Sequence, residues 1–250
     1  MLETIRHDEI LELNLARKPA NALNPELVEK LTAALREASR QADAVVVSGM
    51  PGMFCAGLDL PELIKADRNE ISRFWQAFLN LSKTIAHLPI PIAFALTGHS
   101  PAGGIVIALF GDYRIMPRGN FKTGFNEVQV GLVVPCVVHK ALVRIVGAHA
   151  AERMLVAGEI LTSERALGLG LADELADEPA DTVASAVRWC RQHLALPRQA
   201  MLKTRSMARA DLHALFDDRS ELGIEKFVDI WFDPETQNTL KAVVARLQNK

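Results

Sequence analysis

The sequence has few cysteines, and they show no paired spacing. Only three occur among the 250 residues, namely Cys55, Cys136 and Cys190. An odd number of widely separated cysteines argues against a disulfide scaffold and against a zinc site, and it favours a reducing compartment. We therefore expect no structural metal and no disulfide.

Long hydrophobic runs are also absent. The longest apolar run, GGIVIALFG at residues 103–111, is much shorter than the roughly 18 residues that span a membrane. The N-terminal stretch MLETIRHDEI is charged and lacks the apolar core of a secretory signal. The final QNK is neither a lipidation signal nor a peroxisomal one. These observations lead us to expect a cytoplasmic protein that does not contact membranes.

An excess of charge of one sign is missing too. The chain has 28 lysines and arginines against 30 aspartates and glutamates, and its formal net charge is -2. Such a balance does not predict nucleic acid as a partner. No Gly-Lys-Ser/Thr phosphate loop and no nicotinamide or flavin motif occurs, so we expect no bound cofactor. The composition, 49% hydrophobic and 23% charged, is that of a globular protein.

The first half of the sequence alternates between predicted strands and helices. Continuous apolar runs are typical of strands buried on both faces, and alternation of apolar and polar residues is typical of a half-buried strand. On these patterns, strands are predicted at residues 9–16, 44–49 and 91–98. Helices are predicted at residues 24–38, where Asn24 is a suitable N-cap and Pro25 suits the first helical position, and at residues 70–87.

After residue 119, predicted helices outnumber strands. Short strands are predicted at residues 113–116, 121–123 and 171–173. Helices are predicted at residues 137–146, 150–156, 163–167, 182–194, 198–208 and 219–232, with a last one after Asp233 and Pro234. Alternation followed by helices favours an α/β core with a helical C-terminal part. We place the boundary near residue 190, which gives a core over residues 1–190 and a helical region over residues 191–250.

A pair of glycines begins the apolar run SPAGGIVIALFGDYRI at residues 100–115. Glycine weakens a helix by about 1 kcal/mol relative to alanine, so two of them in a first turn need a reason. Ser100 suits an N-cap and Pro101 the first helical position, which predicts Gly103 at the third. The first N–H groups of a helix have no intrahelical partner, and without a Cβ a ligand oxygen can approach closely.

A second small-residue turn follows the predicted strand at residues 44–49. It lies in PGMFCAGLDLPEL, where Ala56, Gly57 and Leu58 form the turn and Asp59 is placed to cap the next helix. Both turns follow buried strands, where open α/β sheets build their sites. Two backbone donors that converge on one oxygen form an oxyanion hole. Taken alone, each loop is more often only a tight turn.

Taken together, the motifs resemble one family. The patterns are FCAGLDL, PAGGxxxALxxDYRI and FNEVQVGLVVP, supported by KPANALN near the start and by AAERMLVAGEILTSERALGLGLADEL later. In this order they resemble the crotonase (enoyl-CoA hydratase/isomerase) superfamily over nearly the whole chain. The resemblance implies an α/β fold, a spiral of repeated ββα units with a helical C-terminal trimerisation region. It also implies a homotrimer or a dimer of trimers.

The resemblance further implies an acyl-CoA thioester as substrate, whose enolate is held by two backbone N–H groups. Carried over to this sequence, these belong to Leu58 and Gly103. The residues implied for coenzyme A are Lys18, Ala20 and Ala56, although a loop lysine is often only solvated. The residues expected along the acyl chain are Trp75, Phe78 and Val106. Trp75 and Phe78 equally suit the core face of an amphipathic helix.

Acidic residues decide the reaction. The hydratases of this superfamily use two glutamates; Val106 stands at the first position here and Glu127 at the second. A single carboxylate suits a different task, taking a proton from C2 of a 3-enoyl thioester and returning it to C4. The local motifs are likewise most similar to the Δ3,Δ2-enoyl-CoA isomerases of fatty acid metabolism. Apolar neighbours such as Val128 and Val130 are expected to raise the pKa of Glu127.

Several alternatives remain open. A hydratase, or another thioester enzyme with this fold, would need its second acid from a position such as His99 or Asp59. A non-catalytic acyl-CoA-binding subunit would keep the fold without turnover. Glu127 itself, near a helix start, would then only interact with the helix dipole. Outside the site, Asp112 and Arg114 are expected to form a structural ion pair or hydrogen-bond group near the strand.

Overall fold

The structure is a computed structural model that describes residues 1–218 and 222–248, and its strands form two sheets. In spatial order, the larger sheet holds β1 (Leu2–His7), β2 (Ile10–Leu15), β3 (Ala44–Ser48), β5 (Ile92–Ala95), β7 (Tyr113–Pro117) and β10 (Glu174–Ala176). The smaller sheet holds β4 (Gly52–Met53), β6 (Gly98–Pro101), β8 (Lys122–Gly124) and β9 (Ile160–Thr162). From β2 to β10 the larger sheet is parallel.

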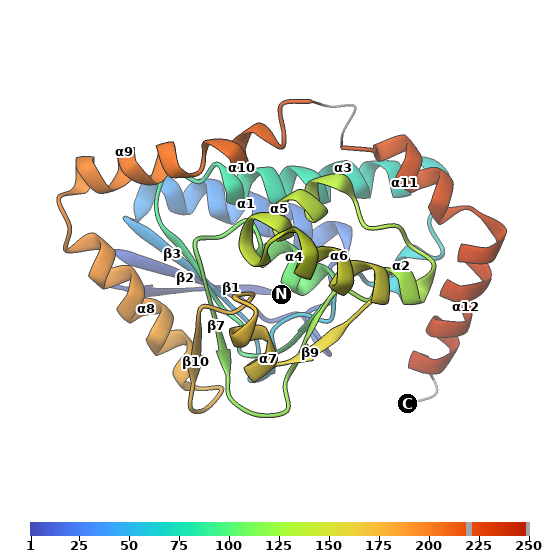
Figure 1. Ribbon diagram of the computed structural model, residues 1–250, viewed down its shortest axis with the longest axis horizontal. Helices are drawn as coiled ribbons and strands as arrows, with labels where there is room; N and C mark the ends of the chain where they lie inside the picture. The colour runs from blue at the N-terminus through green and yellow to red at the C-terminus, as the bar shows by residue number, and fades with distance from the viewer. Residues whose placement is uncertain (219–221, 249–250) are drawn as a thin grey trace.

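Helices follow the strands and dominate the C-terminal part (Figure 1). They are α1 (Pro25–Gln41), α2 (Leu60–Leu63), α3 (Arg68–Ala86), α4 (Gly103–Ala108), the 3-10 helix η1 (Glu127–Val130), α5 (Cys136–Val146), α6 (Ala148–Ala157), α7 (Ser163–Gly168), α8 (Asp181–Leu194), α9 (Arg198–Ala208), α10 (Ala210–Ala214), α11 (Ile224–Trp231) and α12 (Pro234–Gln248).

The chain repeats one unit, a strand in each sheet followed by a helix. Strand β3 leads to β4 and then to α2 and α3, β5 leads to β6 and α4, and β7 leads to β8 and η1. Successive units place β3, β5 and β7 side by side and parallel, and do the same for β4, β6 and β8. This is the spiral of ββα units that the resemblance predicts.

The strands with continuous apolar sequences contribute side chains to two hydrophobic clusters. In β3, Val45 and Val47 belong to the main hydrophobic cluster, whereas Ala44 and Val46 belong to a second cluster on the opposite face of the sheet. Helices α1 and α3 cover the first face and α8 the other (Figure 1). Because successive side chains point to opposite faces, a strand between two helical layers must be apolar throughout.

The predicted strands and helices are largely confirmed, with several exceptions. The Asn24 side chain caps α1 by accepting a hydrogen bond from the Leu27 N–H, and α1 continues to Gln41. The strand predicted at residues 171–173 is wrong, because those residues form a bend and β10 begins at Glu174. Strands β1, β4 and β9 and helix α10 were not predicted. Of the helix predicted at residues 219–232, residues 219–221 lie outside the described residues and α11 begins at Ile224.

Asp112 and Arg114 both form structural ion pairs, as expected, but not with each other. Asp112 instead binds Arg205 and Arg209, at 2.8 and 2.6 Å, and Arg114 binds Asp173 at 2.7 Å. These partners come from α9, from the residue that follows it, and from the loop before β10. Partners so distant in sequence are invisible to a local reading of the DYRI motif.

The C-terminal helices take two different courses. Helix α9 has no buried residue, whereas α11 and α12 return to the core. The Phe227 ring of α11 stacks on Trp75 of α3 with centroids 3.8 Å apart. The predicted boundary near residue 190 falls within α8, whose Cys190 is buried, and the division into two regions stays a prediction.

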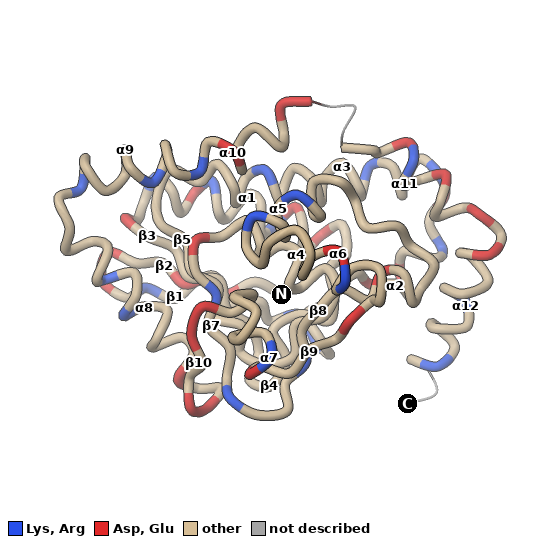
Figure 2. Tube along the Cα trace, in the orientation of Figure 1, with Lys and Arg blue, Asp and Glu red and all other residues tan. Residues whose placement is uncertain are grey.

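Two further expectations concern membranes and charge. Among the residues that the structure describes, no helix is both long and apolar enough to cross a bilayer. Figure 2 shows lysine and arginine interspersed with aspartate and glutamate along the trace. This distribution matches the near-neutral composition.

The contact between β4 and β6 yields a test of the fold. Gly98 pairs with Gly52, and a Cβ at Gly98 would lie 2.0 Å from the Gly52 carbonyl carbon, which is backbone and cannot yield. We predict that Gly98→Ala lowers the free energy of unfolding by about 3 kcal/mol or more. The matched control is Gly168→Ala in α7, where a Cβ meets nothing within 4 Å and the change should be neutral or stabilising. Urea denaturation measures both, and equal midpoints for the two variants would contradict the prediction.

Candidate active site

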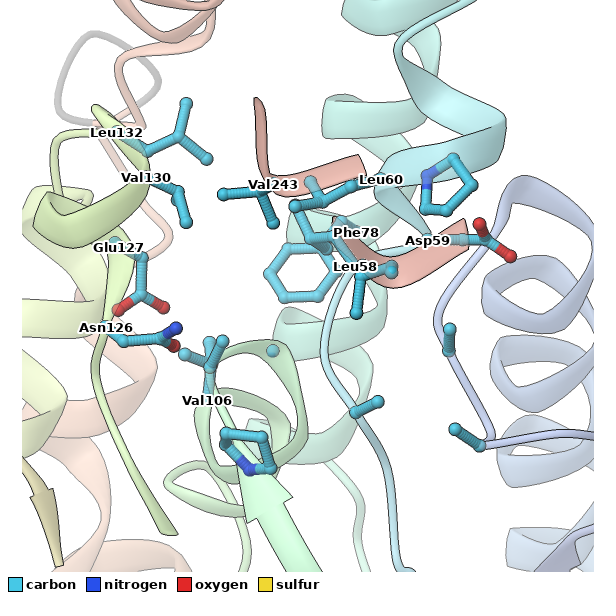
Figure 3. A pocket seen from close by; sticks show the side chains of 18 of the residues that line it. Leu58, Asp59, Leu60, Phe78, Val106, Asn126, Glu127, Val130, Leu132 and Val243 are labelled. Carbon is cyan, nitrogen blue, oxygen red and sulfur yellow. The ribbon is translucent and has the colours of Figure 1, made fainter. Parts of the chain in front are cut away.

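A cavity of about 600 Å³ lies between the turns, α3, α4, η1 and the C-terminal helices (Figure 3). Its walls are mostly apolar. Of the residues predicted for the site, those that line it are Ala20, Ala56, Leu58, Trp75, Phe78, Gly103, Val106 and Glu127. The structure therefore brings together residues that are up to 107 positions apart in the sequence, from Ala20 to Glu127.

The two glycine turns touch each other at one wall of the cavity. A Cβ on Gly57 would lie 3.2 Å from the Gly103 nitrogen, so the two backbones are in close approach. Leu58 forms a single parallel bridge with Leu23, in which the Leu23 N–H donates to the Gly57 carbonyl and the Asp59 N–H donates to the Leu23 carbonyl. The bridge uses the Gly57 carbonyl and the Asp59 N–H, and it leaves the Leu58 N–H directed away from Leu23.

The Leu58 and Gly103 amides are free donors. Over residues 1–218 and 222–248, neither N–H donates a hydrogen bond to a protein acceptor. Both residues line the cavity. An unpaired backbone donor is costly unless it meets water or a ligand, so this wall is suited to an oxygen acceptor.

The predicted start of the glycine helix is wrong by two residues. Ser100 and Pro101 belong to strand β6, and Gly103 is the first residue of α4, not the third. The reason is pairing with β8: the Thr123 hydroxyl donates to the Ser100 carbonyl at 3.0 Å, and the Ala102 N–H donates to the Gly124 carbonyl at 2.8 Å. These bonds hold the chain extended until the helix begins, and Ala102 then takes a φ of 47°.

Each glycine of the pair has its own reason. A Cβ on Gly104 would lie 2.6 Å from the Cys55 carbonyl oxygen, so this glycine lets α4 pack against the first turn. A Cβ on Gly103 would lie 3.2 Å from the Gly57 Cα. The close approach of the two turns thus explains both glycines. The N–H of Gly103 is free because this residue is the first of α4 and has no intrahelical acceptor.

Glu127 has a buried carboxylate oxygen without a hydrogen-bond partner among the described residues. This oxygen is Oε2, and Glu127 is the first residue of η1. Burial raises the pKa of Glu127 to about 7 from the ordinary 4.5, opposed only by its own backbone N–H. A group with this pKa can both take and return a proton near neutral pH.

Asn126 is a polar residue of this wall that the sequence did not single out. Its Oδ1 atom is buried without a partner, and Figure 3 shows its side chain beside Glu127 and near Val106. Val106 is 4% exposed and lines the cavity from α4. The position that would carry a second carboxylate in a hydratase is therefore apolar here.

The other candidate acids are occupied elsewhere. Asp59 does line the cavity, but it binds Arg17 at 2.7 Å and caps α2 through the Glu62 N–H. His99 does not line the cavity, and its Nδ1 accepts a hydrogen bond from the Lys122 N–H at 3.0 Å. Neither residue faces Glu127 as a free second acid.

The residues expected along the acyl chain belong to the hydrophobic core and also line the cavity. Trp75 and Phe78 are 3% and 2% exposed, and their rings stack with centroids 5.1 Å apart. Phe227 from α11 also stacks on Trp75 and lines the cavity. Trp75 and Phe78 are therefore core residues that also line the cavity, and their contact with an acyl chain stays a prediction.

Of the three residues predicted to bind coenzyme A, two line the cavity and one does not. Ala20 and Ala56 line the cavity, but Lys18 is exposed and does not. Arg17 lines it instead, although it is already bound to Asp59 and Glu62. Local sequence signals also missed the cavity residues of α12, Val243 and Leu247, because nothing local shows that this helix returns to the core.

A family model described as enoyl-CoA hydratase/isomerase matches residues 6–244. The chain belongs to this family. Human mitochondrial enoyl-CoA delta isomerase 1 is 28% identical over 238 residues, which cover 93% of this chain and 78% of the human protein. A probable enoyl-CoA hydratase of Mycobacterium avium is 32% identical over 225 residues, which cover 88% of this chain and 85% of that protein.

A solved structure supports the same assignment. The crystal structure of human mitochondrial delta3-delta2-enoyl-CoA isomerase matches with a TM-score of 0.93 at 25% identity, and the match covers 99% of this chain and 98% of that one. The enoyl-CoA hydratase/isomerase fold expected from the sequence is thus confirmed. Because the relatives' names include both a hydratase and an isomerase, the names do not select the reaction.

The raised pKa of Glu127 makes a prediction about stability. The folded protein holds this proton more tightly than the unfolded chain, so wild-type stability should fall as pH rises from about 4.5 to about 7. Glu127→Gln removes the buried charge. It should therefore be nearly neutral at pH 4 and stabilise by up to about 3 kcal/mol at pH 8.

Urea unfolding of wild type and variant across this pH range measures the effect. Glu29→Gln, at an exposed position of α1, is the matched control and should change stability little at either pH. A Glu127→Gln variant that is less stable than wild type at pH 8 would show that the carboxylate has a stabilising partner instead.

Proposed function

We propose that this member of the enoyl-CoA hydratase/isomerase family moves the double bond of a 3-enoyl-CoA from C3 to C2, in fatty acid metabolism. The observation that carries the proposal is the single unpartnered carboxylate of Glu127 in an apolar cavity whose wall presents two free amides. A second carboxylate is not available at Val106. This set of groups suits proton transfer on a bound enolate, not the activation of water.

In the proposed mechanism, the two amides hold the thioester oxygen while Glu127 removes a proton and then returns it. The thioester oxygen accepts hydrogen bonds from the Leu58 and Gly103 N–H groups, which stabilise negative charge on that oxygen. Glu127 then removes a proton from C2, and the electrons spread over the dienolate. The protonated carboxyl returns the proton to C4, which leaves the double bond at C2 and regenerates the carboxylate.

The cavity walls support this scheme in two ways. Their apolar side chains keep the pKa of Glu127 near 7, so the carboxylate accepts and releases the proton with a similar driving force. They also exclude water that would trap the intermediate. Beyond the coenzyme A thioester itself, the proposal requires no cofactor.

Binding of the coenzyme A portion is part of the proposal. Ala20 and Ala56 lie at the cavity and offer backbone to the ligand without steric obstruction. Lys18 is close in sequence and exposed, so it would meet a phosphate only outside the cavity. Trp75, Phe78 and Val106 would contact the acyl chain.

The two alternatives predict different assays. Hydration needs a second acid, and Asp59 and His99 are engaged in other bonds. A binding subunit has no use for a buried, unpartnered carboxylate, whose retention is costly. The isomerase proposal therefore accounts for more of the observed site than either alternative.

Turnover tests the reaction directly. The wild-type protein should raise the absorbance of the conjugated thioester when given a 3-enoyl-CoA, and leave a 2-enoyl-CoA unchanged. Glu127→Gln should lower kcat by about 10³-fold while acyl-CoA still binds, since a general base typically contributes 10²–10⁴-fold. Because the base must be deprotonated, wild-type kcat/KM should fall about tenfold for each pH unit below about 7.

Each alternative has its own signature in this experiment. Loss of absorbance from the 2-enoyl-CoA would indicate hydration, and acyl-CoA binding without turnover of either substrate would indicate a binding subunit. Glu29→Gln serves again as the control and should keep wild-type kcat. Full activity in Glu127→Gln would remove that residue from the mechanism.

We also propose that the protein forms a homotrimer, or a dimer of trimers. Helix α9 has no buried residue, and its Met207 is 73% exposed, which is unusual for a large apolar side chain. We predict a solution mass of three or six times the 27.4 kDa of one chain by light scattering. Met207→Glu should shift the mass toward that of one chain, and a wild-type monomer would contradict the proposal.

A further inference from the structure

A second cavity, of about 570 Å³, lies between α5, α8, α9 and the beginning of β7. It shares no lining residue with the active-site cavity. The two cavities lie at opposite ends of α4: Gly103 and Val106 border the first, while Leu109 and Gly111, just past the end of the helix, border the second. Nothing in the proposed reaction uses this second cavity.

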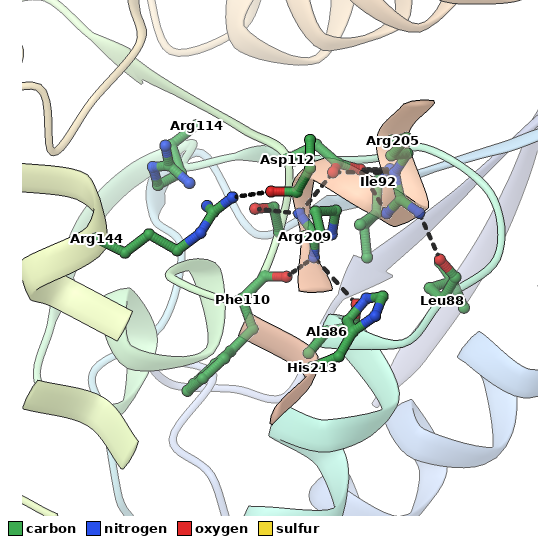
Figure 4. Close-up of polar contacts among 12 residues, drawn as sticks. Ala86, Leu88, Ile92, Phe110, Asp112, Arg114, Arg144, Arg205, Arg209 and His213 are labelled. Carbon is green, nitrogen blue, oxygen red and sulfur yellow. Dashed lines mark hydrogen bonds and ion pairs between the residues drawn. The ribbon is translucent and has the colours of Figure 1, made fainter. Parts of the chain in front are cut away.

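The charges around the second cavity are unbalanced. Four arginines line it, and the single carboxylate among the lining residues is Asp112 (Figure 4). The four are Arg114, Arg144, Arg205 and Arg209. Arg205 and Arg209 share Asp112, which also accepts a hydrogen bond from the Ile92 N–H. One carboxylate therefore serves two guanidinium groups.

The other two arginines are paired outside the cavity lining. Arg114 binds Asp173 and the Leu171 carbonyl through Nη2 and Nε. Arg144 binds Asp211 and the Ala208 carbonyl, again through Nε and Nη2. In the described part of the chain, the Nη1 group of neither arginine has an acceptor, so each keeps one free donor.

Arg209 supplies an enclosed donor. This residue is 5% exposed, and its Nε is buried without an acceptor among the described residues. Burial lowers the pKa of Arg209 to about 10; Asp112 opposes this effect, and Arg205, Arg144 and Arg114 add to it. An anion bound among these cations would relieve their mutual repulsion.

The remaining walls are apolar and partly aromatic. The Trp189 indole stacks on Tyr113, with centroids 5.0 Å apart, and contacts the tilted His193 ring, with centroids 4.0 Å apart. Leu196, Pro197 and Met201 continue this wall. A ligand with a flat or alkyl body would bury that body here while its charged end meets the arginines.

We propose that the second cavity binds a small organic anion, with its carboxylate or phosphate held by Arg114 and Arg144 and its apolar body against Trp189. The inference is independent of the reaction proposed for the first cavity. Guanidinium groups suit both kinds of anion because their planar donors match two oxygens at once. The apolar wall distinguishes such a ligand from an inorganic ion.

Calorimetric titration of the full chain tests the proposal with three probes. Phenyl phosphate and 3-phenylpropionate carry the two anionic groups, and 3-phenylpropanol is the neutral analogue. At least one anion should bind about tenfold more tightly than the alcohol, and the comparison of the two anions shows which group the site takes. Arg144→Gln should weaken that binding about tenfold.

Two further variants keep the test independent of folding. Arg118→Gln removes an exposed arginine that pairs with Asp177 and lines neither cavity, so it should leave binding unchanged. Ala200→Trp fills the cavity from the exposed face of α9 and should abolish binding. Displacement of the probe by an acyl-CoA analogue, or wild-type affinity in Arg144→Gln, would overturn the proposal. Probe binding with wild-type affinity in Ala200→Trp would overturn it as well.

Discussion

The contact between two backbone turns is the constraint on which the rest of the site depends. Gly57, Gly103 and Gly104 have no side chains, and a Cβ on any of them would meet backbone of the opposite turn at 2.6 to 3.2 Å. Gly57 also has a φ of 90°, which other residues rarely adopt. Only with this close approach do the Leu58 and Gly103 amides reach one wall of one cavity. The spiral, by placing β4 beside β6, brings the two turns together.

The second requirement, a carboxylate with a raised pKa, opposes stability. An apolar cavity that keeps the pKa of Glu127 near 7 also makes its charged form costly at neutral pH. The cost is tolerable because the cavity is enclosed by elements whose own packing is extensive, above all the stacked rings of Trp75, Phe78 and Phe227. The proposed catalytic role of Glu127 and the cost of its charge therefore have one cause, the removal of water from around its carboxylate.

Sequence patterns predicted the elements whose causes are local, and they failed where the cause is distant. The runs at β3 and β5 and the cap at Asn24 depend on neighbours in the chain, and they were predicted. The start of α4 at Gly103 depends on β8, and the position of β10 depends on β7, so both were misplaced. Glu127 and the amides came from the family resemblance, whereas α12 and Arg17 left no local signal at the cavity.

Helix α4 shows how one short element can serve two environments. At its beginning, the free Gly103 N–H faces an apolar cavity and favours an oxygen with developing negative charge. Past its end, Arg209 donates to the Phe110 and Gly111 carbonyls, at 2.6 and 3.3 Å, and so satisfies acceptors of the turn that follows the helix. Because these carbonyls and Asp112 fix Arg209 in place, the positive charge at the second cavity is set by the backbone. It cannot be relieved by rotating the side chain into solvent, which suits the anion proposed for this cavity.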